Sequence, residues 1–401
     1  MELLRKWDCN VPTLRFPNYN GEWQKTVMGK VCSFRKGYGI AKDDLSRGGT
    51  PCILYGELYT TYKTAIAKTI KSKTSIQSKS LVYSQKDDVI IPCSGETAED
   101  IATSICVPYD GVLLGGDLTI VHSDLDGAFL SNQINSVRKF DIARIAQGKS
   151  IVHLQADELK KIFIFYPSIQ EQRKISAFID KIDERIEIQN KIIEDLKVLK
   201  KELCAKLFGS PLCGRIIAIE QVADIYGGYA FNSKAYVNKG KYKIVTIGNV
   251  TGDKYISGNY NTIDRLPNNI QKPQVLSKGD ILVSLTGNVG RISIVDGDEY
   301  LLNQRVAKLG IEDDLTKEYI YQYLSNSSFE KDMINAGQGA AQKNIKNQDI
   351  LSYCIRFPTD QTALENIDKL LSLYDIRITS EKAILSNLIL QKSYYLRAMF
   401  I

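Results

Sequence analysis

The chain contains little of what enzyme active sites are usually built from. It has two histidines in 401 residues, and neither lies near a Gly-x-Ser-x-Gly sequence, which leaves little room for a nucleophilic triad. It also lacks the Asn/Asp-Pro-Pro-Tyr motif of amino-methyltransferases and the motor motifs of helicases. We therefore expect a protein that is not an enzyme by itself.

Two glycine-containing stretches match phosphate-binding loops only in part. Gly148-Lys149-Ser150 would end such a loop, but Ala143 occupies the position where the motif needs its first glycine. The stretch from Gly337 to Gln342 lacks the third glycine of a dinucleotide-binding fingerprint and does not stand in a strand–helix pattern. We interpret both stretches as surface loops, and we expect no cofactor bound by this chain.

Cysteine usage and hydropathy exclude several other classes. No two of the eight cysteines form a Cys-x-x-Cys pair, and with two histidines available a zinc cluster is not expected. Thiols without a disulfide framework indicate a reducing, cytoplasmic location. The first residues lack an apolar signal core, and no run approaches about 18 apolar residues, so we expect neither a signal peptide nor a membrane partner.

Composition and charge suit a globular protein of ordinary type. Hydrophobic residues make up 44% and charged residues 24% of the chain, and 401 residues suffice for two domains with connecting elements. The net charge of +6 allows a polyanionic partner. A globular protein with a slight excess of lysine explains the charge equally well.

The most informative positive feature is an internal repeat. Short sequences recur along the whole chain at a spacing of 191 residues (228 − 37 = 191) or 192 residues (278 − 86 = 192). The pairs are Gly37-Tyr38 with Gly228-Tyr229, Gln147-Gly148 with Gln338-Gly339, Tyr166-Pro167 with Phe357-Pro358, and Lys86–Ile90 with Lys278–Leu282. One module has therefore been duplicated, and a chain with two similar modules is suited to binding two different targets at a fixed separation.

Both copies end in a long segment with a heptad pattern. Its apolar residues alternate at spacings of four and three, which is typical of helices that pair in a coiled coil. The seam comprises Ile175, Ile179, Ile182, Ile186, Ile193, Leu196, Leu203 and Leu207, and in the second copy Ile367, Leu371, Tyr374, Ile378, Leu385, Leu388, Tyr395 and Met399. It is interrupted at Gln189 and Lys200, and 192 residues later at Glu381 and Lys392. The shared interruptions favour pairing of the two helices, and two independent core helices remain the alternative.

The predicted fold class is α+β, with two tandem modules of mixed strands and helices, each followed by a long helix. Within the modules, residues 128–146 and 316–335 have helical patterns. The expected ranges are an N-terminal entry segment at 1–22, a first module at 23–168, a first spacer helix at 169–208, a linker at 209–218, a second module at 219–358 and a second spacer helix at 359–401. At a rise of about 1.5 Å per residue the first helix would span roughly 55 Å, a length that suits a spacer.

Lysines are the main candidates for polyanion contact in the first module. Between Leu58 and Lys86 there is no acidic residue, and the lysines alternate with hydroxyl-bearing side chains, which together can bind phosphates. A solvated lysine-rich loop explains this stretch equally well. The candidates in this module are Arg35, Lys36, Tyr38, Lys63, Lys68, Lys71, Lys73 and Lys149.

In the second module the candidates are amide and guanidinium side chains on predicted loops. Arginine, asparagine and glutamine make paired hydrogen bonds to the edges of guanine and adenine. The candidates are Tyr229, Asn232, Lys234, Asn288, Arg291, Asn303, Gln304, Arg305, Gln342, Lys343 and Asn344. Each of them could instead cap a turn or bond within its own loop, so the sequence predicts a group of contacts and not an individual one.

Several of these sequences resemble a known family. The start Val11–Pro17 with Gly21-Glu22-Trp23, the helix opening Tyr166–Ile175, and the segments Lys278–Leu282 and Gly339–Ile345 are similar to those of specificity (S) subunits of type I restriction–modification systems. The resemblance covers essentially the whole chain. In the second copy, Phe357–Ala363 lacks the Glu-Gln pair that follows the proline in the first.

The resemblance implies a DNA-binding function in defence against foreign DNA. Each module would be a target recognition domain that binds one half of a split, asymmetric sequence in double-stranded DNA. The two helices would form an antiparallel coiled coil that sets the distance between the half-sites. Two methyltransferase (M) subunits would dock and bring S-adenosylmethionine and adenine methylation, and restriction (R) subunits would add translocation and cleavage driven by ATP with magnesium.

Two other functions remain open at this point. A stand-alone, sequence-specific DNA-binding regulator would need tight binding without partners, for which the net charge of +6 is modest. A coiled-coil adaptor without a DNA role would show no DNA affinity even with a methyltransferase present. The sequence of the DNA target cannot be derived, because loop side chains do not form a readable code.

Overall fold

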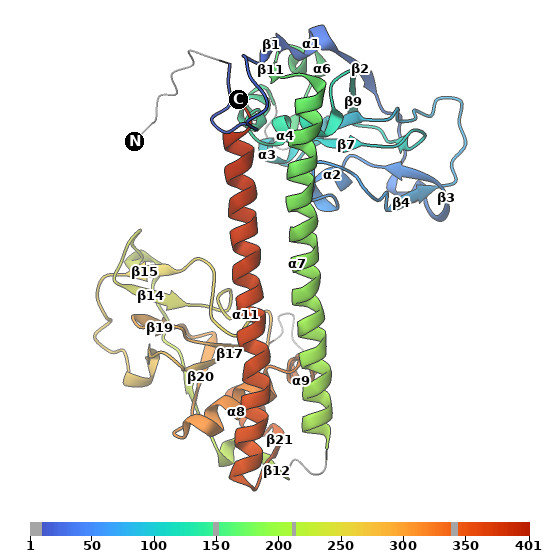
Figure 1. Ribbon diagram of the computed structural model, residues 1–401. Coiled ribbons are helices and arrows are strands. Elements are labelled where there is room, and N and C mark those ends of the chain that lie inside the picture. Colours follow the sequence, from blue (N-terminus) through green and yellow to red (C-terminus); the bar gives the residue numbers. More distant parts are fainter. Residues whose placement is uncertain (1–9, 147–151, 211–213, 338–343) are drawn as a thin grey trace. The chain divides into compact units, whose positions relative to one another are not determined.

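The computed structural model describes residues 10–146, 152–210, 214–337 and 344–401 (Figure 1). The chain divides into two compact units, of which the first holds residues 1–190 and 384–401 and the second holds residues 191–383. Each unit contains one strand-rich module and a part of both long helices, α7 (Ile169–Gly209) and α11 (Gln361–Ala398). Both helices therefore begin in one unit and end in the other.

The first module is built on a four-stranded antiparallel sheet in the order β2-β9-β5-β7. Its strands are β2 (Cys32–Lys36), β5 (Asp88–Pro92), β7 (Ile105–Val107) and β9 (Leu118–Ser123). A three-stranded sheet and two strand pairs comprise β1 (Gln24–Val27), β3 (Leu45–Ile53), β4 (Ser72–Thr74), β6 (Ser94–Gly95), β8 (Leu113–Leu114), β10 (Val152–His153) and β11 (Phe163–Tyr166). The helices are η1 (Lys42–Asp44), α1 (Met28–Val31), α2 (Glu57–Thr60), α3 (Ala98–Ile101), α4 (Gly127–Asn135), α5 (Lys139–Ile145) and α6 (Ala156–Leu159).

The second module repeats this design. Its main antiparallel sheet has the order β13-β20-β17-β18, with β13 (Asp224–Gly227), β17 (Ile281–Ser284), β18 (Ile292–Ile294) and β20 (Val306–Gly310). A second sheet and one strand pair comprise β14 (Tyr242–Val245), β15 (Asn261–Ile263), β16 (Val275–Leu276), β19 (Tyr300–Leu302), β12 (Arg215–Ala218) and β21 (Cys354–Phe357). The helices are η3 (Ile219–Gln221), η4 (Ser233–Ala235), η5 (Lys272–Gln274), α8 (Asp314–Leu324), α9 (Ser327–Ala336) and α10 (Asn347–Leu351).

One inner strand of each main sheet, β5 or β17, is buried on both faces. In β5, Val89 and Ile91 face the core that contains α4, while Ile90 faces a second core with Ile53 and Leu114. A strand covered on both sides needs a continuous apolar run instead of alternation. The cores therefore hold the sheet as the middle layer of the module, which leaves the loops at the strand ends to carry exposed polar residues.

The repeat seen in the sequence extends to individual hydrogen bonds. Asp88 Oδ2 accepts a hydrogen bond from the Gln85 amide at 2.8 Å, and Asp280 Oδ2 accepts one from the Ser277 amide at 2.8 Å. The residue before each aspartate has positive φ, with Asp87 at 64°. The same turn thus leads into β5 and into β17, and the duplication of one module is confirmed.

The repeated glycines Gly37 and Gly228 lie where two backbone segments nearly touch. A Cβ at Gly37 would lie 1.9 Å from the carbonyl oxygen of Gly115, and a Cβ at Gly228 would lie 2.0 Å from that of Asn303. No side chain fits at such a distance. The glycine therefore recurs because the chain passes equally close to itself at the end of β2 and of β13.

The two long helices pair in antiparallel orientation, as expected for this fold class. In the first unit the start of α7 packs on the end of α11, where the Phe178 and Tyr395 ring centroids are 4.9 Å apart. In the second unit the end of α7 packs on the start of α11, where Cys204 and Phe208 share a core with Leu371. The apolar seam predicted from the heptads is thus largely buried between the helices.

The Glu-Gln pair at the first helix start is buried and serves the fold of the first unit. Arg15 of the entry segment donates Nε to Glu171 Oε1 at 2.7 Å and Nη2 to Glu171 Oε2 at 2.8 Å. Gln172 Oε1 accepts from the Asp126 amide at 3.0 Å, and its Nε2 donates to the Pro167 carbonyl at 2.8 Å. At the equivalent place in the second copy, Leu364 enters an apolar core instead.

Two expectations from the sequence need correction in detail. The helices expected at 128–146 and 316–335 are each two helices, α4 with α5 and α8 with α9, and at each break a serine hydroxyl bonds a carbonyl of the preceding turn. Ser136 Oγ donates to Asn132 O at 2.6 Å, and Ser325 Oγ donates to Gln322 O at 3.2 Å. The range 209–218, expected as a linker, contains β12, which pairs with β21 and so belongs to the second module.

Candidate nucleic-acid interface

Three loops and Asn344 of the second module meet at one end of its main sheet. We call this end the loop edge and define it by residues 228–231, 285–291, 303–305 and Asn344. The Gln304 amide donates to the Tyr229 carbonyl at 3.0 Å, and the Leu285 amide donates to the Arg305 carbonyl at 3.0 Å. Thr286 forms an antiparallel bridge with Asn344. Segments far apart in the sequence are therefore joined by backbone hydrogen bonds.

The loop edge presents amide and guanidinium groups to solvent. Asn288, Gln304, Arg305 and Asn344 are exposed. The side chain of Asn303 is half-buried, and its Oδ1 accepts from the Arg305 amide at 3.3 Å. Exposed donors and acceptors held by a rigid backbone are what hydrogen bonding to base edges requires.

Other candidates of the second module have partners within the protein. Arg291 Nε lies 3.2 Å from Glu330 Oε1, so its charge is partly neutralised. Tyr229 donates its hydroxyl to Asn269 Oδ1 at 2.7 Å, and Asn232 Oδ1 accepts from the Lys234 amide at 3.0 Å as the cap of η4. Lys234 itself is exposed. The structure thus gives Arg291, Tyr229 and Asn232 local structural contacts.

The first module has the same loop edge, and of its residues the sequence had predicted only Tyr38. The Cys93 amide donates to the Asp117 carbonyl at 2.6 Å, which matches the bond from Leu285 to Arg305. Ser94 pairs with His153 across β6 and β10, and Ser94 Oγ lies 3.2 Å from His153 Nδ1. The repeat spacing would have found this pair, because Thr286 and Asn344 stand 192 (286 − 94) and 191 (344 − 153) residues later. The loop edge of the first module comprises Tyr38, Ser94–Glu96, Gly115–Asp117 and His153.

Two of the basic candidates of the first module, Arg35 and Lys36, line a cleft of about 670 Å³ together with the loop-edge residues Ser94, Asp117 and His153, and the others lie elsewhere. Arg35 Nη2 lies 2.6 Å from Asp88 Oδ2, whose side chain is wholly buried. Lys63, Lys68 and Lys71 line a separate cleft of about 590 Å³ beside α7 and the end of α11. Lys36, Lys73 and Tyr38 are exposed, and of these Tyr38 belongs to the loop edge. The candidates Lys149, Gln342 and Lys343 lie outside the residues that the structure describes.

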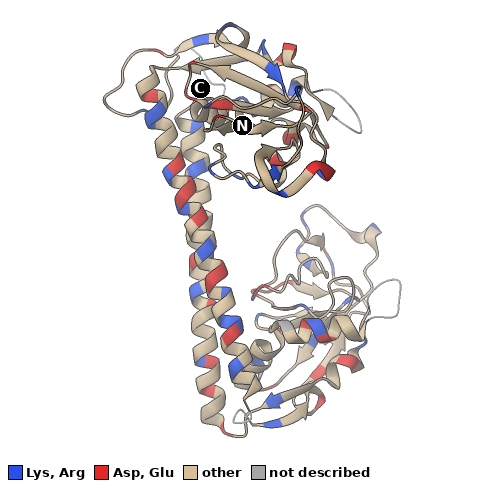
Figure 2. Ribbon diagram, turned by 90° about the vertical axis from the view of Figure 1, so that its right-hand side faces the viewer, with Lys and Arg blue, Asp and Glu red and all other residues tan. Residues whose placement is uncertain are grey.

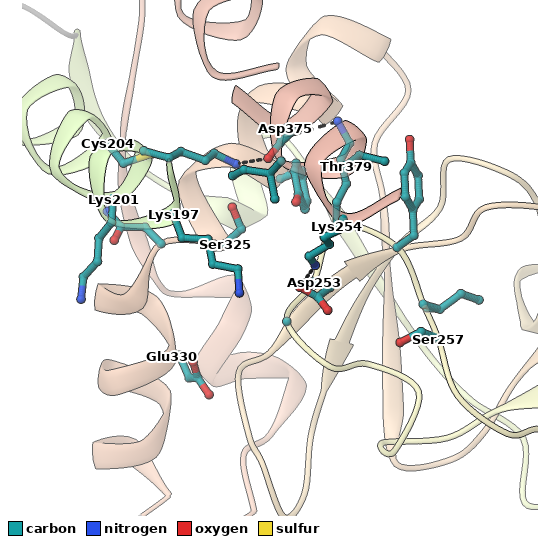
Figure 3. A pocket seen from close by; sticks show the side chains of 18 residues that line it. Lys197, Lys201, Cys204, Asp253, Lys254, Ser257, Ser325, Glu330, Asp375 and Thr379 are labelled. Atoms are coloured by element: carbon teal, nitrogen blue, oxygen red, sulfur yellow. Dashed lines mark hydrogen bonds and ion pairs between the residues drawn. The ribbon is translucent and has the colours of Figure 1, made fainter. Parts of the chain in front are cut away.

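A corresponding cleft of about 510 Å³ lies beside the helices in the second unit (Figure 3). It is lined by the segment 252–257 and by residues of α7, α8, α9 and α11, and Lys197 and Lys201 extend into it (Figure 3). The repeat relates the two clefts, because Asp375 stands 192 residues after Asp183 (375 − 183) and Ile378 stands 192 residues after Ile186 (378 − 186).

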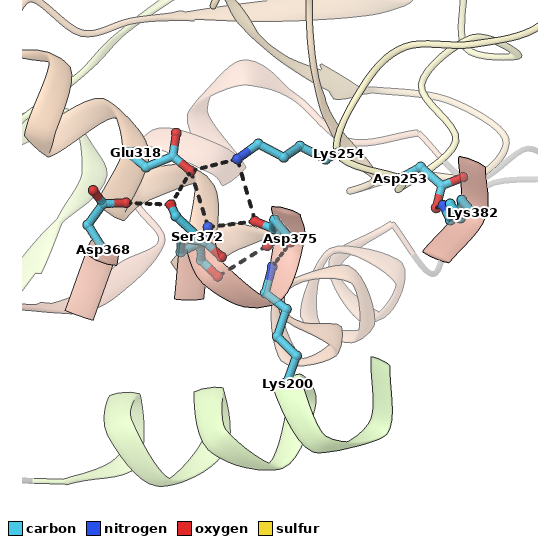
Figure 4. Close-up of polar contacts among 10 residues, drawn as sticks. Lys200, Asp253, Lys254, Glu318, Asp368, Ser372, Asp375 and Lys382 are labelled. Atoms are coloured by element: carbon cyan, nitrogen blue, oxygen red, sulfur yellow. Dashed lines mark hydrogen bonds and ion pairs between the residues drawn. The ribbon is translucent and has the colours of Figure 1, made fainter. Parts of the chain in front are cut away.

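Three residues that line this second cleft, Lys200, Lys254 and Asp375, belong to a network of ion pairs (Figure 4). Lys254 Nζ lies 3.2 Å from Glu318 Oε1 and 3.6 Å from Asp375 Oδ2, and Lys200 Nζ lies 2.5 Å from Asp375 Oδ1. Burial lowers the pKa of the Lys254 ammonium, but the carboxylates of Glu318 and Asp375 outweigh burial and hold it above the usual value. The Lys254 side chain is therefore positively charged at neutral pH, although most of it is buried.

Charges of both signs alternate along α7 and α11 (Figure 2). In the part of the chain that the structure describes, no group of three or more histidine, cysteine, aspartate or glutamate side chains is placed to hold a metal ion. Among the same residues, no helix is both long and apolar enough to cross a bilayer. The arrangement of the loop edges is suited to hydrogen bonding with a polar, anionic ligand.

Comparison with known proteins gives a consistent set of relatives. The family model of the type I restriction modification DNA specificity domain matches residues 20–198 and 215–389. The specificity subunit of the type I restriction enzyme MjaVIII from Methanocaldococcus jannaschii is 27% identical over 259 residues, which cover 57% of this chain. The chain spans 60% of the length of that curated relative.

Solved structures show the same fold. The S subunit of a type I restriction-modification system from M. genitalium matches with a TM-score of 0.59 and 17% identity, over 98% of this chain and 99% of that chain. A chain from a structure concerned with complex assembly and conformational transition of the type I R-M system matches with a TM-score of 0.54 and 17% identity, over 93% and 96% of the two chains.

Proposed function

Because the chain belongs to the family of type I restriction–modification DNA specificity domains, we propose that it is a specificity subunit that binds a split, asymmetric sequence in double-stranded DNA. The observation that carries the proposal is the presence of two equivalent loop edges in one chain, each made of exposed polar side chains on a rigid sheet. The chain itself catalyses no step in this proposal. Its role is to select the DNA sequence on which partner subunits act.

Each loop edge would enter DNA at one half of the target. Gln304 and Asn344 can make paired hydrogen bonds to adenine, and Arg305 can do so to guanine. Lysines beside or outside the loop edges, such as Lys36 and Lys73, would contact phosphates and contribute affinity without sequence preference. This division of roles separates residues that select a base from residues that hold the backbone.

The two halves of the target would differ in sequence because the two loop edges differ in chemistry. Ser94, Asp117 and His153 occupy the places that Thr286, Arg305 and Asn344 occupy in the second module. An aspartate accepts hydrogen bonds from cytosine N4, whereas an arginine donates to guanine. The duplicated fold therefore supports two half-sites in opposite orientation, and the changed side chains support an asymmetric target.

The partners in this proposal are two methyltransferase subunits, which dock along the helices and the modules, and restriction subunits. Exposed apolar side chains on the helices support a docking surface of this kind. In the second unit, Leu373 and Ile376 of α11 are 56% and 62% exposed, and in the first unit Leu390 is 63% exposed. S-adenosylmethionine, ATP and magnesium would bind to the partner subunits and not to this chain.

The proposal is tested by expressing the chain with an adenine-methylating M subunit of the same source and mapping methylated adenines across the host genome. We expect a new split motif that is absent when either protein is expressed alone. Gln304→Ala and Asn344→Ala should each relax one or two positions in one half of the motif, at about 1–3 kcal/mol of discrimination per base, and leave the other half unchanged.

Two outcomes would contradict the proposal. A stable complex with the M subunit that methylates no motif would assign the chain a regulatory role. Tight, sequence-specific DNA binding by the chain alone, with no complex formed, would assign it to the class of stand-alone regulators.

A further inference from the structure

In the first module a short segment is attached to the edge of the main sheet. Residues 65–68 run beside β7, where Ile66 forms a parallel bridge with Cys106. The Cys106 amide donates to the Ala65 carbonyl at 2.8 Å, and the Ala67 amide donates to the Cys106 carbonyl at 2.9 Å. We call this segment the strap of the first module.

The second module has a strap at the same edge of its main sheet. Residues 254–256 run beside β18, where Tyr255 forms a parallel bridge with Ile294. The Ile294 amide donates to the Lys254 carbonyl at 2.7 Å, and the Ile256 amide donates to the Ile294 carbonyl at 3.0 Å. β18 is the structural equivalent of β7, so both straps extend the sheet at its fourth strand.

Each strap carries a lysine that reaches carboxylates on a helix. Lys68 Nζ lies 2.6 Å from Asp180 Oδ1 and 3.0 Å from Glu184 Oε1, both on α7. Lys254 Nζ lies 3.2 Å from Glu318 Oε1 on α8 and 3.6 Å from Asp375 Oδ2 on α11 (Figure 4). Within each unit, the lysine therefore joins the sheet of the module to the long helices.

The two lysines are not counterparts in the repeat. They stand 186 residues apart (254 − 68), and the positions 192 residues after Asp180 and Glu184 are Ser372 and Ile376. Duplication alone would have copied one lysine with its own carboxylates. The same connection is instead built from different residues in each module.

The strap of the second module lies next to its loop edge. β18 begins directly after the turn that carries Asn288 and Arg291, and Gly252, two residues before Lys254, lies against the Arg291 side chain. In the first module, β7 follows the connection that begins at Ser94. A shift of the strap would therefore shift the strand from which a base-contacting loop emerges.

We propose that Lys68 and Lys254 are positioning residues, each of which holds the loop edge of its module in the orientation that binds its half of the DNA target. The proposal rests on the proposed function for its consequence in DNA recognition. It replaces the sequence-based interpretation of Lys68 as a phosphate contact, because both carboxylates already lie within 3.0 Å of its Nζ. Neither lysine touches DNA in this role.

The first test measures the anchoring itself in the full chain without DNA. Lys254→Gln should increase amide hydrogen exchange at Ile256 and Ile294 about fivefold or more, because the strap loses its attachment to the helix carboxylates. Lys254→Arg, which keeps the charge, should restore most of the protection. Lys239→Gln, at an exposed lysine of the same module, is the matched control and should change nothing. Unchanged exchange at both amides in Lys254→Gln would overturn the proposal.

The second test measures DNA recognition. Its reference is the set of genomic sites that are methylated when the wild-type chain is expressed with the M subunit. Lys254→Gln should lower discrimination against single mismatches about fivefold in the half-site of the second module and leave the other half-site unchanged. Lys68→Gln should lower discrimination in the half-site of the first module and leave the half-site of the second module unchanged. Lys42→Gln, at an exposed lysine of the first module, is the matched control. If the lysine contacted a phosphate instead, its variant would lose affinity for all DNA sequences equally. That affinity would also depend less on the salt concentration.

The outcomes separate the inference from the proposed function. A wild-type pair that methylates no split motif would contradict the proposed function, while the exchange measurement would still decide whether the lysines anchor the straps. If the wild-type chain directs methylation to a split motif, two results would overturn the positioning role. One is unchanged half-site discrimination in both variants, and the other is a uniform loss of affinity with a reduced dependence on salt.

Discussion

Lys200 of α7 and Asp375 of α11 form a largely buried ion pair across the two helices, with 2.5 Å between Nζ and Oδ1. The first unit contains the same pair in Lys392 and Asp183, at 2.6 Å. The repeat relates both partners, since 392 − 200 = 192 and 375 − 183 = 192. Each helix thus gives a lysine to one pair and an aspartate to the other. An unpaired charge in a buried seam is unfavourable, so the pairs favour this antiparallel register over others.

The two pairs should differ in their contribution to stability. Burial raises the pKa of the Asp183 carboxyl and Lys392 opposes this, so Lys392→Met would leave a buried charge and lower the free energy of unfolding by about 3 kcal/mol. Asp375 keeps Gln322 Nε2 at 2.8 Å and Lys254 in the Lys200→Met variant, so we expect a loss of about 1 kcal/mol there. Differential scanning calorimetry of both variants measures the difference.

A double variant serves as the control for this prediction. Lys392→Met combined with Asp183→Leu removes both charges and should recover most of the stability, because an apolar pair suits a coiled-coil seam. Equal losses in the two single variants, or no recovery in the double variant, would contradict the assignment of these pairs.

The close backbone approach at the repeated glycines gives a second prediction. Gly37→Ala would place a Cβ 1.9 Å from the Gly115 carbonyl oxygen, whereas Gly39→Ala meets no atom within 4 Å. We expect the first variant to lose about 3 kcal/mol or more and the second to change stability little. Urea denaturation monitored by circular dichroism measures both.

The second module offers the same comparison. Gly228→Ala would place a Cβ 2.0 Å from the Asn303 carbonyl oxygen, and Gly227→Ala meets no atom within 4 Å. Because Asn303 belongs to the loop edge, Gly228→Ala should also weaken recognition of one half-site. If the two variants were equally stable, the close contact between the two backbone segments would not be the reason why the glycine recurs.

The sequence predicted the features that depend on periodicity and on duplication. The heptad seam, the two modules and the loop group around Thr286, Asn303 and Asn344 follow from patterns that are local or that recur at a fixed spacing. The breaks after α4 and α8 were missed, because the apolar pattern continues across each break.

The partners of individual charges could not be predicted from the sequence. Lys68 lies in a stretch without acidic residues, and its carboxylate partners stand more than 100 residues away on a helix (180 − 68 = 112). A lysine in such a stretch has the composition of a phosphate contact, and only the fold shows that it is paired. The loop edge of the first module, apart from Tyr38, was missed for a different reason, because Ser94 and His153 carry no strong sequence pattern of their own.

Thiol reactivity provides a third prediction. Burial raises the pKa of the Cys32 and Cys204 thiols to about 11, whereas Cys354 is exposed. At pH 8 a rise from 9.0 to about 11 lowers the thiolate fraction about 100-fold, in addition to the barrier that burial places before a reagent. Iodoacetamide followed by peptide mass spectrometry should label Cys354 within minutes and leave Cys32 and Cys204 unlabelled. Rapid labelling of Cys204 in the folded chain would contradict its burial beside α11.

The same shifts determine how stability depends on alkaline pH. A thiol with a raised pKa holds its proton in the folded state over a range where the unfolded chain has lost it. Its contribution to stability is complete below pH 9.0, the ordinary thiol value, and is lost as pH rises through about 11. We expect the melting temperature to fall between pH 9 and pH 11, and to fall less in Cys204→Ala than in the parent chain, relative to each protein at pH 8.

The role of the helices as a spacer gives the last prediction. Removal of four residues from each helix, at 188–191 and at the equivalent positions 380–383, would shorten the pair by about 6 Å, or nearly two base pairs of B-form DNA. The spacer between the two methylated half-sites should change accordingly, while both half-site sequences stay the same.

Removal of four residues from α7 alone should instead misalign the buried seam and destabilise the chain, because Lys200 and Asp375 would lose their register. Methylation mapping with the M subunit reads out the spacer directly. A shortened pair that still methylates the original motif with its original spacer would exclude the helices as the element that sets the distance, and the separation of half-sites would then have to be fixed by contacts that the partner subunits make.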